Sequence, residues 1–192
     1  MILPGQIIEE YVDHGLISIE PDFDSAQVRP FGLRVHLDEH VLVPEPGQHV
    51  DLSSDQKPSP RFQERNLQEG PLVLAPGGFC LGSTLEAFRL APSLLCRLDG
   101  RSTIARLGLL IYCSAAVIDS NHSEHRSIVL ELANVGPFSL TIPSHIGIGM
   151  VTFERVTGEA SLELEQTQYE GQRRATAPNL DFSPPAYQPG RK

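Results

Sequence analysis

The sequence lacks the long apolar segments of membrane and secreted proteins. It has no run of about 18 apolar residues, the length that a membrane-spanning helix needs. Its start also lacks a basic region followed by an apolar stretch, which a secretory signal requires. We therefore expect neither membrane insertion nor secretion, and the cytoplasm is the default location.

Positive charge is scarce as well. The chain has 15 Lys and Arg against 24 Asp and Glu, a formal net charge of −9. Nonspecific affinity for nucleic acid comes from Lys and Arg that neutralise phosphates. A nucleic-acid polymer is therefore not an expected partner, although a local basic pocket remains allowed.

Cysteine is rare and unpaired. Cys80, Cys96 and Cys113 lie singly in apolar surroundings, with no C-x-x-C pair. This excludes a disulfide framework and a zinc ribbon and predicts three buried thiols in a reducing compartment. The zinc-deaminase signature, the G-x-S-x-G elbow and the phosphate-binding Gly-Lys-Ser/Thr loop are also absent.

What is present indicates a single β domain. The 192 residues are 40% apolar and 20% charged, which suits one compact core. Sixteen Gly and 16 Pro are scattered along the chain and favour many short strands joined by turns. We therefore expect a mainly β fold, a sandwich or a barrel.

The hydrophobic spacing divides the chain into elements. Residues 5–14 have helical spacing and end at a glycine, residues 30–43 alternate as a strand that could continue into a hairpin, and residues 44–70 are expected to form a long surface loop. Further strands are expected within residues 71–90, 94–100, 107–118, 126–136, 138–142 and 148–156. We divide the chain into a β domain, residues 1–164, and an irregular tail, residues 165–192, that orders on binding.

The segment DGRSTIARLGLL, residues 99–110, is the densest cluster of polar side chains. Arg101 and Arg106 flank Ser102 and Thr103, and together with backbone N–H groups they could hold an anion. A polar turn that caps a short helix would have the same composition, so the pattern leaves both interpretations open.

A second segment, residues 115–136, offers carboxylates and histidines. Glu131 alternates with apolar residues in a predicted strand; facing inward it could be a general base, and facing outward it would be merely solvated. Asp119 follows an apolar run and is expected near a strand end. His122 and His125 could hold zinc with Glu124, but the segment is loop-like and a third ligand is not evident, so no metal is the favoured interpretation.

These residues stand in a sequence that resembles the dCTP deaminase family over nearly its whole length. The resemblance rests on LAPGGFCLGSTLEAFRLAPSLLCRLDGRSTIARLGLL, IVLELANVG, IGMVTFE and the tail segment QYEGQ, which occur in the family's order. It implies a dUTPase-like jelly-roll or β-barrel with a short N-terminal helix. It also implies a homotrimer with shared active sites, and zinc-independent hydrolytic deamination of dCTP to dUTP and ammonia.

The resemblance also assigns roles. Glu131 matches the general base, Arg106 the residue that orients it and balances its charge, and Ser102 and Ala115 the groups that hold the attacking water. Arg101, Ser102 and Thr103 match residues that bind the triphosphate, which would carry Mg²⁺. Asp119 matches the contact to deoxyribose, and Tyr169 and Gln172 match the tail that closes over the site, residues 165–192.

The sequence departs from the family pattern at several places. Arg34 and His36 stand where Asp and Arg are usual, so a supporting polar pair is changed. Residues 116–122 differ from the usual pocket loop, Gln168 replaces a common lysine, and Ser144 and His145 alter a turn. Two alternatives therefore stay open: a dUTP diphosphatase or bifunctional enzyme, and a non-catalytic nucleotide-binding regulatory protein of the same fold.

Overall fold

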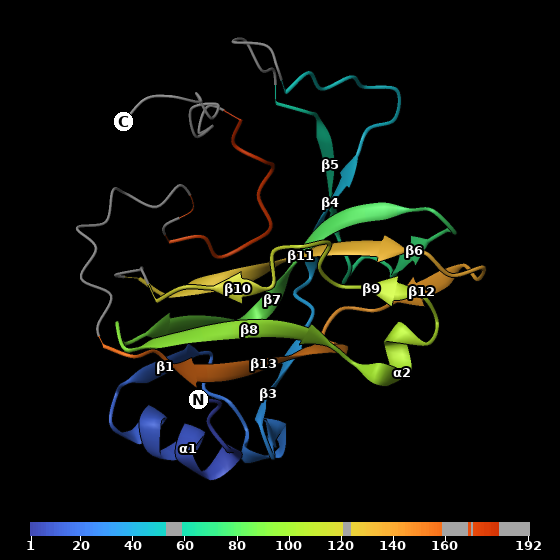
Figure 1. Cartoon of the computed structure of the whole chain (residues 1–192). Coiled ribbons are helices and arrows are strands. Elements are labelled where there is room, and N and C mark those ends of the chain that lie inside the picture. Colours follow the sequence, from blue (N-terminus) through green and yellow to red (C-terminus); the bar gives the residue numbers. More distant parts are fainter. Residues whose placement is uncertain (53–58, 121–123, 159–168, 170, 181–192) are drawn as a thin grey trace, which may run out of the picture.

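The computed structural model describes residues 1–52, 59–120, 124–158, 169 and 171–180, and these form two packed antiparallel sheets, a small two-stranded ladder and two short helices (Figure 1). The elements follow in chain order: α1 (Gly5–Asp13), β1 (Ile17–Glu20), the 3-10 turn η1 (Ser25–Gln27), β2 (Val28–Arg29), β3 (Gly32–His36), β4 (His40–Pro44), β5 (Phe62–Asn66), β6 (Leu72–Leu74), β7 (Phe79–Leu90), β8 (Leu94–Gly100), α2 (Ser102–Ala105), β9 (Leu109–Leu110), β10 (Val117–Ile118), β11 (Arg126–Asn134), β12 (Leu140–Ile142) and β13 (Gly147–Arg155).

Two sheets carry the fold. One has the order β5-β4-β7-β11-β9, with β1 also paired to β7, and the other has the order β10-β8-β13-β3-β2. Strands β6 and β12 form a small separate ladder. The predicted mainly β fold is confirmed.

The core lies between the inner faces of the two large sheets. Strands β3 and β13 alternate as the sequence pattern requires, so that Leu33, Val35, Val151 and Phe153 are fully buried. Ile8 of α1 is also fully buried, which places the predicted helix against the end of the core. The ring of Phe153 lies 6.1 Å from that of Phe88, from the opposite sheet.

Three predictions about elements are corrected. Residues 30–43 form two strands, β3 and β4, in different sheets, because the chain crosses over after Leu37, whose N–H donates to the carbonyl of Ile146. The predicted loop 44–70 contains β5, which pairs with β4. Only the ends of the predicted strand 107–118 are extended pairs, β9 and β10.

The cysteine prediction holds for two residues of three. Cys80 and Cys96 are fully buried, and burial raises the pKa of each thiol to about 12. Cys113 is exposed, because residues 111–116 lie outside any strand and connect β9 in one sheet to β10 in the other. Among the described residues no helix is long and apolar enough to cross a membrane.

Candidate active site

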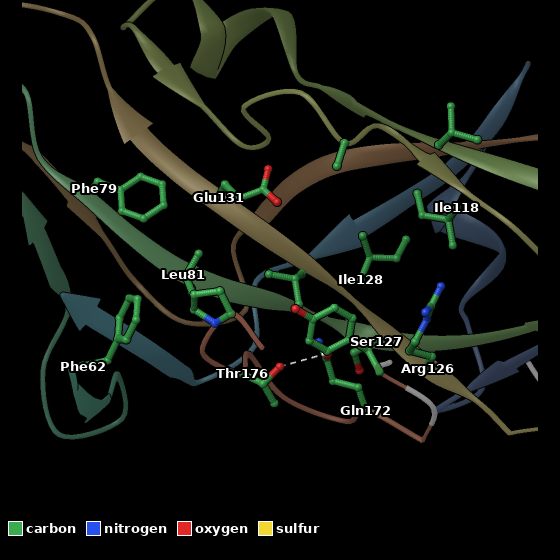
Figure 2. A pocket seen from close by; sticks show the side chains of 15 residues that line it. Phe62, Phe79, Leu81, Ile118, Arg126, Ser127, Ile128, Glu131, Gln172 and Thr176 are labelled. Atoms are coloured by element: carbon green, nitrogen blue, oxygen red, sulfur yellow. Dashed lines mark hydrogen bonds between the residues drawn. The ribbon is translucent and has the colours of Figure 1, made fainter. Parts of the chain in front are cut away.

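A cavity of about 520 Å³ opens on the outer face of β7 and β11, between these strands and the chain segment that follows residue 168 (Figure 2). Its walls come from five places in the sequence. The lining residues are Phe62, Phe79, Leu81, Ala115, Val117, Ile118, Arg126, Ser127, Ile128, Val129, Glu131, Tyr169, Gln172, Thr176 and Pro178.

Glu131 is the carboxylate of this cavity. Its neighbours Leu130 and Leu132 are fully buried, so the alternation along β11 turns Glu131 away from the core and into the cavity, half-buried. Its Oε2 accepts a hydrogen bond of 2.8 Å from the backbone N–H of Cys113. The sequence pattern allowed an inward Glu131 that acts as a base or an outward Glu131 that is solvated. In the structure Glu131 faces away from the core but lines a cavity.

Apolar side chains oppose the carboxylate. Glu131 pairs with Leu81 in the register of β11 and β7, and Phe79 pairs with Ala133 two positions along. Phe62 of β5 adds a second ring to this wall (Figure 2). The cavity therefore combines one fixed carboxylate with an apolar wall, which suits a heterocycle that exchanges protons.

The tail covers the cavity. The N–H of Ser127 donates to the carbonyl of Gln172 at 2.9 Å, and Ser127 Oγ donates to the carbonyl of Arg173 at 3.3 Å. Gln172 is only 8% exposed, and its Oε1 accepts from Thr176 Oγ1 at 3.1 Å. The hydroxyl of Tyr169 accepts from the N–H of Asn179 at 3.2 Å. Both predicted tail residues thus line the cavity.

An ionic contact holds the tail to β1. Arg173 Nη1 lies 2.8 Å from Glu20 Oε2, and His125 Nδ1 lies 3.3 Å from Glu20 Oε1. The hydrogen bond from Arg173 lowers the pKa of Glu20. His125 Nε2 also lies 2.8 Å from Ser18 Oγ, and partial burial lowers the pKa of its ring. His125 is therefore part of the tail contact.

The described residues contain no group of three or more His, Cys, Asp and Glu that could hold a metal ion. His122, the other member of the histidine pair, lies outside the described residues, as does Gln168.

The predicted triphosphate residues do not line this cavity. Arg101 precedes α2, and Ser102 and Thr103 are exposed on its first turn. Arg106 directly follows α2, is exposed, and makes no ion pair within 4.0 Å with a carboxylate of the described chain. The predicted pairing of Arg106 with Glu131 is therefore absent within one chain, because the two residues lie on separate parts of it.

Ala115 and Asp119 lie on the cavity side of the molecule. Ala115 lines the cavity directly. Asp119 follows β10, as the apolar run predicted, and its Oδ1 lies 3.9 Å from Nη2 of Arg126, which lines the cavity. Ala115 and Asp119 therefore belong with Glu131, Tyr169 and Gln172.

A pair of glycines holds the α2 segment against the end of β11. Gly108 has φ of +88°, and a Cβ there would lie 2.3 Å from the backbone N of Gly136. The N–H of Val135 donates to the carbonyl of Gly108 at 2.8 Å. Both glycines belong to the quoted family segments, and this close backbone contact explains why no side chain fits there.

Arg34 and His36, which replace the family's usual polar pair, make different contacts. His36 Nδ1 lies 2.7 Å from Oε1 of Glu86, a carboxylate that is only 2% exposed, and its backbone N–H donates to Oε2. Gln27 Nε2 donates to the same carboxylate at 2.9 Å. Arg34 joins this group only through its backbone carbonyl, which accepts from Gln27 Nε2 at 3.2 Å, and its side chain lies over Gly147.

Several cavity residues carry no clear signal in the sequence. Phe62, Phe79 and Leu81 were not singled out, and Arg126 and Ser127 were placed only within a strand. The signal available in the sequence is the alternation on either side of Glu131, which places Val129 on the same face of the strand as Glu131.

Comparison with known proteins shows the family of this chain. A family model described as dCTP deaminase-like matches residues 2–156. A "dCTP deaminase, dUMP-forming" of Streptomyces coelicolor is 34% identical over 183 residues, 92% of this chain and 94% of that protein. The protein of the same name from Mycobacterium avium is 37% identical over 182 residues, again 92% and 94%.

A solved structure shares the fold. The 2'-deoxycytidine 5'-triphosphate deaminase from Agrobacterium tumefaciens superposes with a TM-score of 0.59 at 19% identity. The match covers 81% of this chain and 48% of that chain, so this protein spans about half its length. The chain belongs to the dCTP deaminase-like family.

Proposed function

We propose that the protein deaminates dCTP hydrolytically and converts the product to dUMP. The observation that carries the proposal is Glu131, a single carboxylate fixed by a backbone N–H and turned into a cavity with an apolar wall. Relatives at 34% and 37% identity bear the name "dCTP deaminase, dUMP-forming". These names favour the bifunctional alternative over dUTP as the end product.

The first step adds water to the base. Glu131 takes a proton from a water that attacks C4 of cytosine, and returns protons to the ring and to the leaving amino group, so that dCTP and water give dUTP and ammonia. The backbone of Ala115 and the hydroxyl of Ser102 from a neighbouring subunit would hold this water. The apolar wall of Phe79 and Leu81 keeps the ring in place and limits bulk water around the carboxylate.

The second step hydrolyses the phosphate chain. A second water attacks the α-phosphorus, the bond to the bridging oxygen breaks, and dUTP and water give dUMP and pyrophosphate. Asp119 helps to activate this water and contacts the deoxyribose. Mg²⁺ would be supplied with the triphosphate, as is common for nucleotide substrates. The ion would neutralise negative charge on the phosphate chain.

A neighbouring subunit completes the site. Arg101, Ser102, Thr103 and Arg106 lie around α2, away from the cavity of their own chain. In a trimer, α2 of one subunit would bring these side chains to the Glu131 cavity of the next. Arg106 would then balance the charge of Glu131, and Arg101 would bind the triphosphate.

Product analysis tests the proposal. Purified full-length protein is incubated with dCTP, dUTP or dCMP in the presence of Mg²⁺, and the products are separated by chromatography. We expect dUMP and pyrophosphate from dCTP. If only dUTP accumulates, the protein is a deaminase and the proposed second step is rejected. If dUTP gives dUMP while dCTP does not react, the protein is a diphosphatase.

The non-catalytic alternative is separated by binding. Absence of any product, together with intact binding of dCTP, would support a regulatory nucleotide-binding protein and reject both steps.

A further inference from the structure

Three arginines from three segments converge on one corner of the five-stranded sheet. Arg29 ends β2, Arg34 is the middle residue of β3, and Arg101 follows β8. Arg29 lies opposite Gly32 across the β2–β3 pair, and alternate residues of a strand share a face, so Arg34 lies on that same face. We call these three residues the arginine cluster.

A glycine lets two of these side chains meet. A Cβ at Gly147 would lie 3.0 Å from Cδ of Arg34 and 3.1 Å from Nη1 of Arg101. The same Nη1 donates a hydrogen bond to the carbonyl of Gly147. The side chains of Arg34 and Arg101 therefore occupy adjoining space over the backbone of β13.

The cluster has no acidic partner within the described chain. None of its guanidinium groups forms an ion pair within 4.0 Å among the residues that the structure describes. Asp99 lies two strands away from Arg34 in register, with Met150 between them, and its Oδ1 accepts from the N–H of Gly100. Partial burial lowers the pKa of Arg34, and the charges of Arg29 and Arg101 lower it further.

Such an arrangement favours an anion. Like charges held together repel one another, and the net charge of this protein is −9, so an uncompensated positive cluster stands out against its surroundings. Guanidinium groups present forked N–H donors that match phosphate oxygens, and a bound polyphosphate would remove the repulsion between them.

We infer that Arg34 and Arg29 extend the phosphate-binding group of Arg101 and contact the polyphosphate of the nucleotide. The inference rests on the proposed function, in which Arg101 binds the triphosphate. It assigns a role to a departure from the family pattern, since an aspartate usually stands where this chain has Arg34. A positive side chain there strengthens binding of the phosphate chain without touching the base.

Calorimetric titration of the full-length protein with inorganic tripolyphosphate and with deoxycytidine tests this inference. We expect Arg34→Gln to weaken tripolyphosphate binding by about tenfold or more, and Arg34→Lys to weaken it less, because a charged donor remains. Deoxycytidine binding should not change. KM for dCTP should rise by a similar factor while kcat stays close to wild type.

Arg155→Gln is the matched control. Arg155 is exposed at the opposite end of β13 from Gly147, so this variant removes the same charge from the same sheet without touching the cluster. We expect it to change tripolyphosphate affinity by less than about twofold. Circular dichroism and native mass are compared for all variants.

The outcomes separate this inference from the proposed function. Unchanged tripolyphosphate affinity in Arg34→Gln, with normal turnover of dCTP by the wild type, would overturn the inference alone. If Arg34→Gln loses tripolyphosphate binding and the wild-type protein does not convert dCTP, the polyphosphate site is supported and the proposed reaction is rejected. A changed native mass in Arg34→Gln would overturn the inference, because the cluster would then pair with a carboxylate of a neighbouring subunit.

Discussion

Backbone structure, and not a second charged side chain, positions the carboxylate of Glu131. The β11 alternation turns its side chain into the cavity, and the N–H of Cys113 holds one carboxylate oxygen. No described residue donates a hydrogen bond to Oε1, so this oxygen can accept one from a water. Cys113 contributes its backbone amide here; partial desolvation and the nearby charge of Glu131 raise the pKa of its thiol.

Removing the charge of Glu131 should separate binding from chemistry. We expect Glu131→Gln to lower the deamination rate by about 10² or more and to keep the affinity for dCTP, because the amide fills the same space but cannot accept a proton. Single-turnover kinetics and calorimetric binding measure the two effects. Glu10→Gln, on the exposed face of α1, is the control. Turnover like the wild type in Glu131→Gln would remove this residue from the mechanism.

At the scale of elements, α2 depends on a contact between two loops. The close approach of Gly108 and Gly136 joins the chain after α2 to the end of β11. Asn134 stabilises the same corner: its Nδ2 donates to the carbonyls of Leu74 and Phe138, and its Oδ1 accepts from the N–H of Gly136.

A side chain at Gly108 should disrupt this corner. We expect Gly108→Ala to lower the free energy of unfolding by about 2–4 kcal/mol, since the residue is left-handed and its Cβ would overlap the backbone of Gly136. Urea denaturation measures the change. Gly70→Ala is the control, because a Cβ there meets nothing within 4 Å. Equal stability of the two variants would contradict the proposed role of the contact.

The tail contact should respond to acid. The hydrogen bond from Arg173 lowers the pKa of Glu20, and partial burial lowers that of His125 despite the opposing charge of Glu20. A group whose pKa is lower when the tail is attached stabilises the attached state at pH values above its ordinary pKa. This stabilisation is lost as the pH falls from the ordinary pKa through the lowered pKa. Attachment should therefore weaken first below the ordinary histidine value of 6.5, and again below the ordinary glutamate value of 4.5.

Hydrogen exchange of the Ser127 amide, which donates to Gln172, reports this attachment. After correction for intrinsic rates, its protection in the wild type should fall between pH 7 and pH 5.5, and His125→Asn should flatten that fall. Ser18, Glu20, Arg89 and Arg173 are the groups around the ring, and all remain in this variant. His49→Asn, at an exposed position, should behave as the wild type. A profile of His125→Asn that matches the wild type would exclude the ring as the sensor.

At the scale of the whole molecule, one chain carries two halves of a proposed site that do not meet. The Glu131 cavity has the base wall and the tail, and the α2 segment has Arg101, Ser102 and Arg106. The proposed trimer brings one half from each of two neighbouring subunits.

Mixed oligomers test this sharing. We expect Glu131→Gln and Arg106→Ala each to be inactive alone, and an equal mixture, dissociated and reassembled, to recover about a quarter of wild-type activity, since statistical mixing pairs intact halves at that frequency. Native mass spectrometry confirms that mixed oligomers form. Mixed oligomers without recovered activity would show that both residues act within one chain.

Composition and hydrophobic spacing are enough to predict the class of the fold and most of its elements. Alternation at Leu33 and Val35 and the helical spacing of residues 5–14 reflect burial against a core, which is a local pattern and can be recognised without coordinates. The resemblance led to Glu131, Tyr169 and Gln172, which share one cavity in the structure.

Only the tertiary structure decided which residues meet. The crossover after Leu37 and the pairing of β5 with β4 depend on contacts between distant segments, which local spacing does not encode. The same holds for the apolar wall opposite Glu131, for the separation of Arg106 from it, and for the approach of Arg34 to Arg101 over Gly147. The physical reason is that side-chain alternation assigns a face to each residue, whereas sheet order and register determine what that face contacts.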